Sequence, residues 1–215
     1  GREAGSPEHR KAAEYVAARF AEAGLEPAGT AAGSFLQPVR FNSRRIVEER
    51  SSLTLVRGGA EVPVVLGDEA TISVRISPAP ELEAPLVFVG YGLTVPTVGR
   101  ADLEGMDLKG KVVVFLSGAP ADVPAATSAH FQSTRWMTMR EAGAVGTIEI
   151  RNPRANDIPW ERYKRSRFNA GVTLAEETLE ENHGQRLAAV FNPAHADKLL
   201  AGTGHTAAEL MRLAE

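Results

Sequence analysis

The sequence predicts an α+β fold, mostly β with a few packed helices, in which an isolated amphipathic helix precedes the β-rich part. Short apolar runs of strand length recur from about residue 35 onward, separated by turns rich in glycine and proline. Patterns with the helical period are fewer, and one of them comes before the first strand. Together these observations favour a β-rich domain with an appended helix.

The appended helix is predicted over Ser6–Gly24. Ser6 is a typical N-cap residue, and Pro7 is typical of the first helical position. Gly24 is suited to a left-handed C-cap, and Pro27 prevents the helix from continuing. The apolar positions follow a period of about 3.6 residues and are Ala12, Tyr15, Val16, Phe20 and Ala23.

The predicted strands differ in how far we expect them to be buried. Continuous apolar runs at 86–89 and 112–116 are typical of strands buried on both faces. Alternation at 72–76 is typical of a half-buried strand, and the turn at 57–60 predicts a hairpin. Further strands are predicted at 35–41, 46–56, 62–66, 145–150, 172–174 and 187–191, helices at 130–142, 193–200 and 206–213, and a polar loop at 151–171.

Composition excludes several classes of function. The chain has 215 residues with 27 acidic and 24 basic side chains. Its net charge of −3 does not indicate the positively charged surface that binds nucleic acid. The absence of cysteine excludes disulfides, a thiolate zinc site and a cysteine nucleophile. No apolar run approaches the ~20 residues of a membrane-spanning helix, and no signal peptide is present. Because the first residue is Gly1, we expect a processed or shortened chain.

One triplet resembles a metal-binding motif. His195-Ala196-Asp197 has the H-x-D pattern, which in co-catalytic zinc peptidases supplies a ligand and a bridging carboxylate. Asn192 and Pro193 place His195 in the first turns of a helix, where positions i and i+2 point ~200° apart and cannot meet at one metal ion. The surface-helix interpretation is therefore favoured. We predict no catalytic and no metal-binding residue in this chain.

The segment 151–168 is the most unusual surface candidate, because it holds six basic residues, two acidic residues and three aromatic residues. Exposed aromatic residues beside arginine are enriched at interfaces, which favours a loop that faces a substrate or a partner. The alternative is a solvated loop whose aromatic residues fold back onto the β core. The candidate contact residues are Trp160, Arg162, Tyr163, Arg165 and Arg167.

The amino-terminal residues resemble a known peptidase signature. The sequence reads GREAGS at 1–6, then the amphipathic helix, GLEP at 24–27 and FLQPV at 35–39. This order is similar to the start of the co-catalytic zinc aminopeptidase family, which includes glutamate carboxypeptidase and the transferrin receptor.

A second set of motifs resembles the protease-associated (PA) domain inserted in many of these enzymes. PLVFVGYGL at 85–93 and DLKGKVVV at 107–114 resemble its opening, and AGAVGTI at 142–148 resembles a later element. Residues 191–210 resemble the segment that returns to the peptidase domain. The resemblance implies an incomplete peptidase domain at 1–42, a PA domain of the swivelling β/β/α type at 43–202, and a return segment at 203–215.

The family's zinc ligands lie downstream of its inserted domain, and no segment of this chain matches them. The resemblance therefore implies a non-catalytic portion of a zinc-dependent aminopeptidase, whose two zinc ions belong to a catalytic domain outside the chain. Whether the chain is an enzyme by itself stays open, and we expect it to be inactive. In such a protein the PA domain shapes substrate access or mediates protein contacts. The alternatives are a stand-alone PA-type module that binds proteins or peptides, and a small hydrolase that uses His195 and Asp197.

The resemblance also implies partners and a location. We expect contacts with the parent's own catalytic domain and with peptide substrates, a homodimer through the Ser6–Gly24 helix, and a secreted or periplasmic protein. We expect no nucleic acid partner and no membrane span.

Overall fold

The structure is a computed structural model that describes residues 3–213. It divides into two compact units, one up to Phe41 and one from Asn42 onward. The first unit contains α1 (Pro7–Glu22). Ser6 caps it by accepting a hydrogen bond at Oγ from the His9 amide over 3.1 Å, and Gly24 follows it with φ +72°. The predicted first helix is confirmed, and it contains no buried residue.

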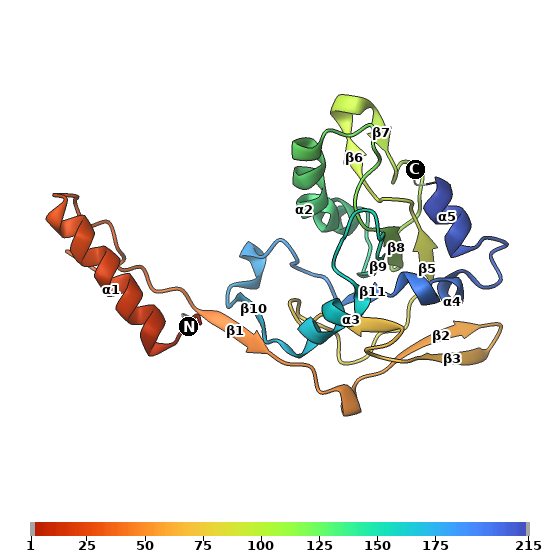
Figure 1. Ribbon diagram of the computed structural model, residues 1–215, viewed down its shortest axis with the longest axis horizontal. Coiled ribbons are helices and arrows are strands. Elements are labelled where there is room, and N and C mark those ends of the chain that lie inside the picture. Colours follow the sequence, from red (N-terminus) through yellow and green to blue (C-terminus); the bar gives the residue numbers. More distant parts are fainter. Residues whose placement is uncertain (1–2, 214–215) are drawn as a thin grey trace. The chain divides into compact units, whose positions relative to one another are not determined.

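The second unit is built on a five-stranded sheet with the order β4-β11-β9-β8-β5 (Figure 1). Four neighbouring strands run parallel, and β4 pairs antiparallel with β11 at one edge. The carboxyl ends of the four parallel strands therefore share one edge of the sheet. The strands are β4 (Ala70–Ile72), β5 (Leu86–Phe88), β8 (Val112–Leu116), β9 (Gly146–Ile150) and β11 (Leu187–Phe191).

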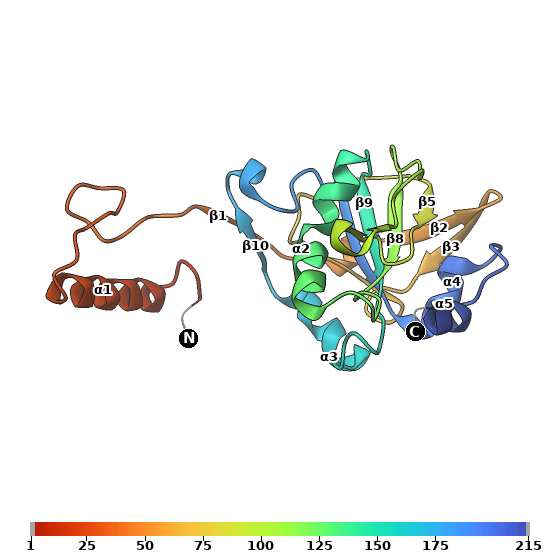
Figure 2. The same ribbon diagram turned by 90° about the horizontal axis from the view of Figure 1, so that it is seen from above.

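Core side chains cover both faces of the interior strand β8, all five residues of which are buried. Val113 and Phe115 pack with Trp136 and Met139 of α2 (Ala125–Glu141). The alternate residues of β8 join a second cluster with the β2–β3 hairpin, α4 and α5. Figure 2 shows α2 on one side of the sheet and these elements on the other. Their bounds are β2 (Leu53–Arg57), β3 (Ala60–Val64), α4 (Asp197–Leu200) and α5 (Ala207–Leu213).

Smaller elements complete the second unit. Two further two-stranded sheets join β1 to β10 and β6 to β7. Short helical turns are found in the segments between strands. The remaining elements are β1 (Phe41–Arg44), η1 (Glu48–Arg50), β6 (Thr94–Val95), η2 (Pro96–Val98), β7 (Arg100–Ala101), α3 (Trp160–Tyr163), η3 (Lys164–Phe168), β10 (Gly171–Leu174), η4 (Glu177–Leu179) and η5 (Pro193–His195).

The α+β class is confirmed, and several element predictions need correction. β5 was expected to be buried on both faces, but it is an edge strand, and Leu86 is 41% exposed. The strand predicted at 46–56 begins only at Leu53, because η1 occupies part of the segment. α2 begins five residues before His130, and the loop predicted at 151–171 contains α3 and η3.

No helix in residues 3–213 has both the length and the apolar character needed to cross a lipid bilayer. The predicted return segment contains α5, which packs onto the core of the second unit through Ala207. The domain boundaries inferred from the resemblance stay predictions.

Candidate functional site

Polar residues gather where the parallel strands of the sheet end. Ser117 and Gly118 follow β8, Arg151 and Asn152 follow β9, and Asn192 follows β11. Because loops at the end of a rigid sheet commonly carry binding groups, this edge is the natural place to look for a site.

Trp160 and Tyr163, two of the five predicted loop residues, fold back onto this edge. Trp160 is half-buried, and its indole Nε1 donates to the carbonyl of Gly67 over 3.2 Å. The guanidinium of Arg151 lies 4.1 Å from the centre of the Tyr163 ring and donates to the carbonyl of Ile158 over 3.1 Å. Burial, followed by the negative charge of Glu149, raises the pKa of Tyr163. These contacts hold the loop against the sheet.

The three predicted arginines of the loop divide into two kinds. Arg167 is half-buried, and its Nε donates to Glu48 Oε1 over 2.6 Å. Its Nη1 also donates to the carbonyl of Lys164 over 2.7 Å. Arg162 and Arg165 are exposed. Two of the three predicted arginines therefore face solvent, and their contact with a substrate or partner stays a prediction.

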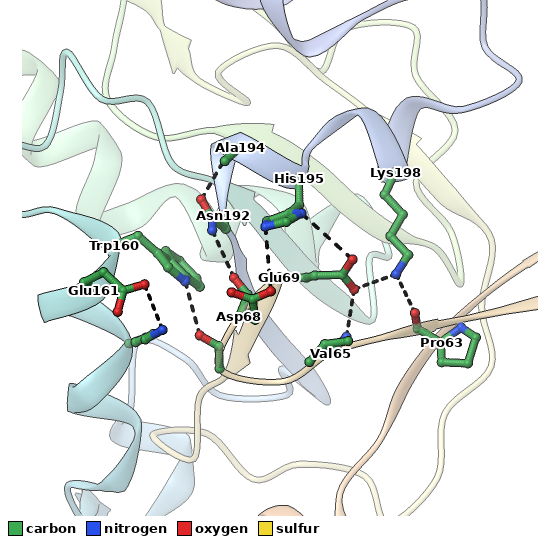
Figure 3. A network of polar contacts seen from close by, with 12 residues as sticks. Pro63, Val65, Asp68, Glu69, Trp160, Glu161, Asn192, Ala194, His195 and Lys198 are labelled. Atoms are coloured by element: carbon green, nitrogen blue, oxygen red, sulfur yellow. Dashed lines mark hydrogen bonds and ion pairs between the residues drawn. The ribbon is translucent and has the colours of Figure 1, made fainter.

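A second group of polar residues surrounds His195 (Figure 3). Its Nε2 lies 3.9 Å from Asp68 Oδ2, and its Nδ1 lies 4.0 Å from Glu69 Oε1. Lys198 donates from Nζ to Glu69 Oε2 over 2.5 Å, and the amide of Val65 donates to the same oxygen over 2.8 Å. Burial pushes the pKa of Glu69 upward, but these hydrogen bonds and the charge of Lys198 outweigh it and leave the pKa below its usual value. The carboxylate of Glu69 is thus held by a resident ammonium group.

His195 and Asp197 do not meet at one point. Asp197 accepts a hydrogen bond at Oδ1 from the Ala207 amide over 2.6 Å, at the start of α5, while His195 faces the turn before β4. Within residues 3–213, no group of three or more histidine, aspartate or glutamate side chains is arranged to hold a metal ion. The described residues therefore do not fit the two zinc ions that the resemblance assigns to a catalytic domain.

A pocket of about 640 Å³ lies at the carboxyl ends of β8 and β9, and none of the residues predicted from the sequence lines it. It lies between the segment 117–125, α2 and the loop that follows β9. Arg135 of α2 and Glu149 of β9 both line it. Glu149 is the one charged residue of β9, and a charge within a largely buried strand is the signal that could have identified the pocket.

Arg135 and Glu149 are unusual charged groups, because Arg135 is buried and Glu149 is half-buried. Arg135 is only 8% exposed, donates from Nη2 to the carbonyl of Gly118 over 3.0 Å, and lies 4.3 Å from the ring centre of Phe115. Burial lowers the pKa of Arg135 to about 10. Burial also raises the pKa of Glu149, against the opposing positive charges of Arg135 and Arg151.

Comparisons with known proteins find only distant structural similarity. No protein-family model matches the chain. No curated protein matches it either. Among solved structures, an aminopeptidase from Aneurinibacillus sp. strain AM-1 is similar with 19% sequence identity and a TM-score of 0.44, over 94% of this chain and 37% of that one. The chain thus spans little more than a third of the length of that structure. At this identity and TM-score, the similarity does not establish a family or an activity.

Proposed function

We propose that the chain is the non-catalytic amino-terminal and PA portion of a zinc-dependent aminopeptidase, in which the PA domain shapes substrate access or mediates protein contacts. The peptide bond would be hydrolysed in the parent's catalytic domain. The proposal rests on the motifs quoted above and on where two of them lie in the fold.

The position of the two opening motifs carries the proposal. In the PA domain a G-Y-G turn leaves one core strand, and a D-L-K-G-K turn enters the next. Here Gly90 and Gly92 follow β5 after Val89, and residues 107–111 lead directly into β8, which pairs with β5 in parallel.

Local contacts explain why these turns need these residues. Gly92 has φ +62°, which disfavours any residue with a Cβ, and a Cβ there would lie 2.4 Å from Cε of Met139, so the Met139 methyl group would have to move. Asp107 accepts hydrogen bonds from the Lys109 amide over 3.1 Å and from Lys111 Nζ over 3.0 Å, which closes the second turn. The local geometry of each turn thus suits the residues of its motif.

The proposal extends to partners and location. The apolar face of α1, formed by Tyr15, Val16 and Phe20, is suited to cover the sheet of the parent's peptidase domain. Arg162 and Arg165 are the loop residues free to contact a peptide or the catalytic domain. The parent would be secreted or periplasmic.

Metal content and peptidase activity of the purified chain test the non-catalytic assignment. We expect no stoichiometric zinc by elemental analysis and no release of p-nitroaniline from aminoacyl-p-nitroanilides after incubation with zinc. Bound zinc with hydrolysis that a chelator abolishes would contradict the proposal. If His195→Ala removed that activity, the self-sufficient hydrolase would replace it.

A further inference from the structure

The pocket at the ends of β8 and β9 contains two opposite charges, Arg135 and Glu149, that attract each other without direct contact. Arg135 and Glu149 influence each other's pKa, yet in the described part of the chain they form no ion pair with each other. Arg135 Nε is buried without a hydrogen-bond partner among the described residues. A buried polar group without a partner costs free energy. The unpaired Nε of Arg135, beside a carboxylate that does not contact it, therefore indicates that a ligand is missing from the pocket.

The start of α2 adds a second source of positive potential to the same pocket. Pro124 stands at the N-cap position without a side-chain hydrogen bond, and Ala125 and Ser128 of the first turn line the pocket. The amides of a first helical turn have no partner within the helix and favour a negative group. The pocket therefore lies beside both the first turn of α2 and Arg135.

The remaining lining combines small apolar residues with the polar side chains of Gln132 and Asn156. Ala119, Pro120, Val123 and Ala155 belong to it, and the volume of about 640 Å³ is in the range of small-molecule sites, which is about 300–1,000 Å³. Ser117 Oγ accepts hydrogen bonds from the Asn152 amide over 2.8 Å and from Asn156 Nδ2 over 3.1 Å, so its hydroxyl hydrogen can point to a ligand.

We propose that this pocket binds a free α-amino acid as its zwitterion. The carboxylate would face the guanidinium of Arg135 and the first turn of α2, and the ammonium would face the carboxylate of Glu149. A ligand whose two opposite charges are attached to one carbon atom can neutralise both protein groups at once.

Ligands with a single charge fit less well. A simple anion would be attracted by Arg135 but repelled by Glu149. A simple cation would be attracted by Glu149 but repelled by Arg135. Arg151, the other cation near Glu149, is already held by Tyr163 and the Ile158 carbonyl. The pocket would bind an amino acid even if the chain belonged to no peptidase, although an aminopeptidase releases ligands of this kind.

Calorimetric titration of the chain tests the proposal with three probes: L-leucine, N-acetyl-L-leucine without the ammonium, and L-leucinamide without the carboxylate. We expect L-leucine to bind and each analogue to bind at least about tenfold more weakly, because each loses one hydrogen-bonded charge pair. Glu149→Gln should weaken L-leucine binding by a similar factor. Glu141→Gln, which changes an exposed carboxylate at the other end of α2, should leave it unchanged.

A second variant keeps the test decisive if Glu149→Gln disturbs folding. Ala121 lines the pocket and is exposed, so Ala121→Trp should block the pocket without touching the charged pair. Loss of L-leucine binding in a normally folded Ala121→Trp supports the proposal. Equal binding of N-acetyl-L-leucine shows a plain anion site, equal binding of L-leucinamide shows a cation site, and no binding of L-leucine at millimolar concentration shows no site. Each of these three results overturns the proposal.

Discussion

Gly118 lies where the segment after β8 approaches the segment after β9, and replacing it by alanine perturbs that approach. Gly118 has φ +92°, and a Cβ there would lie 2.6 Å from Cβ of Ala155. The added methyl group therefore meets both a backbone restriction and a collision. Ala155 offers only a short, rigid side chain, so relief requires one loop to move.

The cost in free energy can be given separately for the backbone restriction and for the collision. A left-handed conformation costs a residue with a Cβ about 1–2 kcal/mol, and an extra methyl group in a packed place costs about 1–3 kcal/mol. We therefore expect Gly118→Ala to lower the free energy of unfolding by about 2–5 kcal/mol, the sum of both effects. Gly110→Ala is the matched control, because Gly110 has φ +70° and nothing within 4 Å of a Cβ. It should cost about 1–2 kcal/mol.

Urea denaturation followed by circular dichroism measures the three variants. The double variant Gly118→Ala/Ala155→Gly removes the collision and should recover most of the difference between Gly118→Ala and Gly110→Ala, less about 0.4–1 kcal/mol for the new glycine. In thermal scans, the gap between the two single variants corresponds to about 2–4 °C per kcal/mol. Equal losses for Gly118→Ala and Gly110→Ala, or no recovery in the double variant, would refute the close approach of the two loops.

Three further predictions follow from single contacts. Trp160→Phe removes the indole N–H that donates to the carbonyl of Gly67 in the turn before β4. The free energy of unfolding measured in urea should fall by about 1 kcal/mol. An unchanged midpoint would contradict the contact. Burial raises the pKa of Glu149, so the folded chain favours the protonated form of this carboxyl. The free energy of unfolding of the wild type, relative to that of Glu149→Gln, should therefore fall as pH rises from 4 to 8, from below the usual glutamate pKa through the raised one. A pH-independent difference would contradict the burial of this carboxyl. If the apolar face of α1 holds two chains together, light scattering should show a dimer for the wild type and a monomer for Phe20→Glu, whereas a monomeric wild type would exclude this dimer.

Features that depend on neighbouring residues could be predicted from the sequence. α1 begins and ends where Ser6, Pro7 and Gly24 predict, because capping acts within one turn of the chain. The buried strand β8 is confirmed because its run of apolar residues has only one favourable environment. The apolar run of β5 looks the same in sequence, but its place at the edge is decided by which strands pair with it.

The candidate pocket depends on contacts between distant residues, which no local pattern contains. Arg135 and Glu149 meet only because α2 packs on the face of β9 that carries Thr147 and Glu149. Trp160 bonds the carbonyl of Gly67 across 93 residues of sequence, so neither partner indicates the other. The aromatic and basic composition of the 151–168 loop identified an unusual segment, but it did not show which of its side chains would be held by the protein itself.

The sequence of the reading frame that encodes this chain tests the central claim most directly. If the chain is the amino-terminal and PA portion of a zinc aminopeptidase, the frame continues past Glu215 into a segment with an H-x-D motif after a strand and a later G-A-x-D-N motif. A stop codon directly after Glu215 would contradict the claim and favour a stand-alone interaction module.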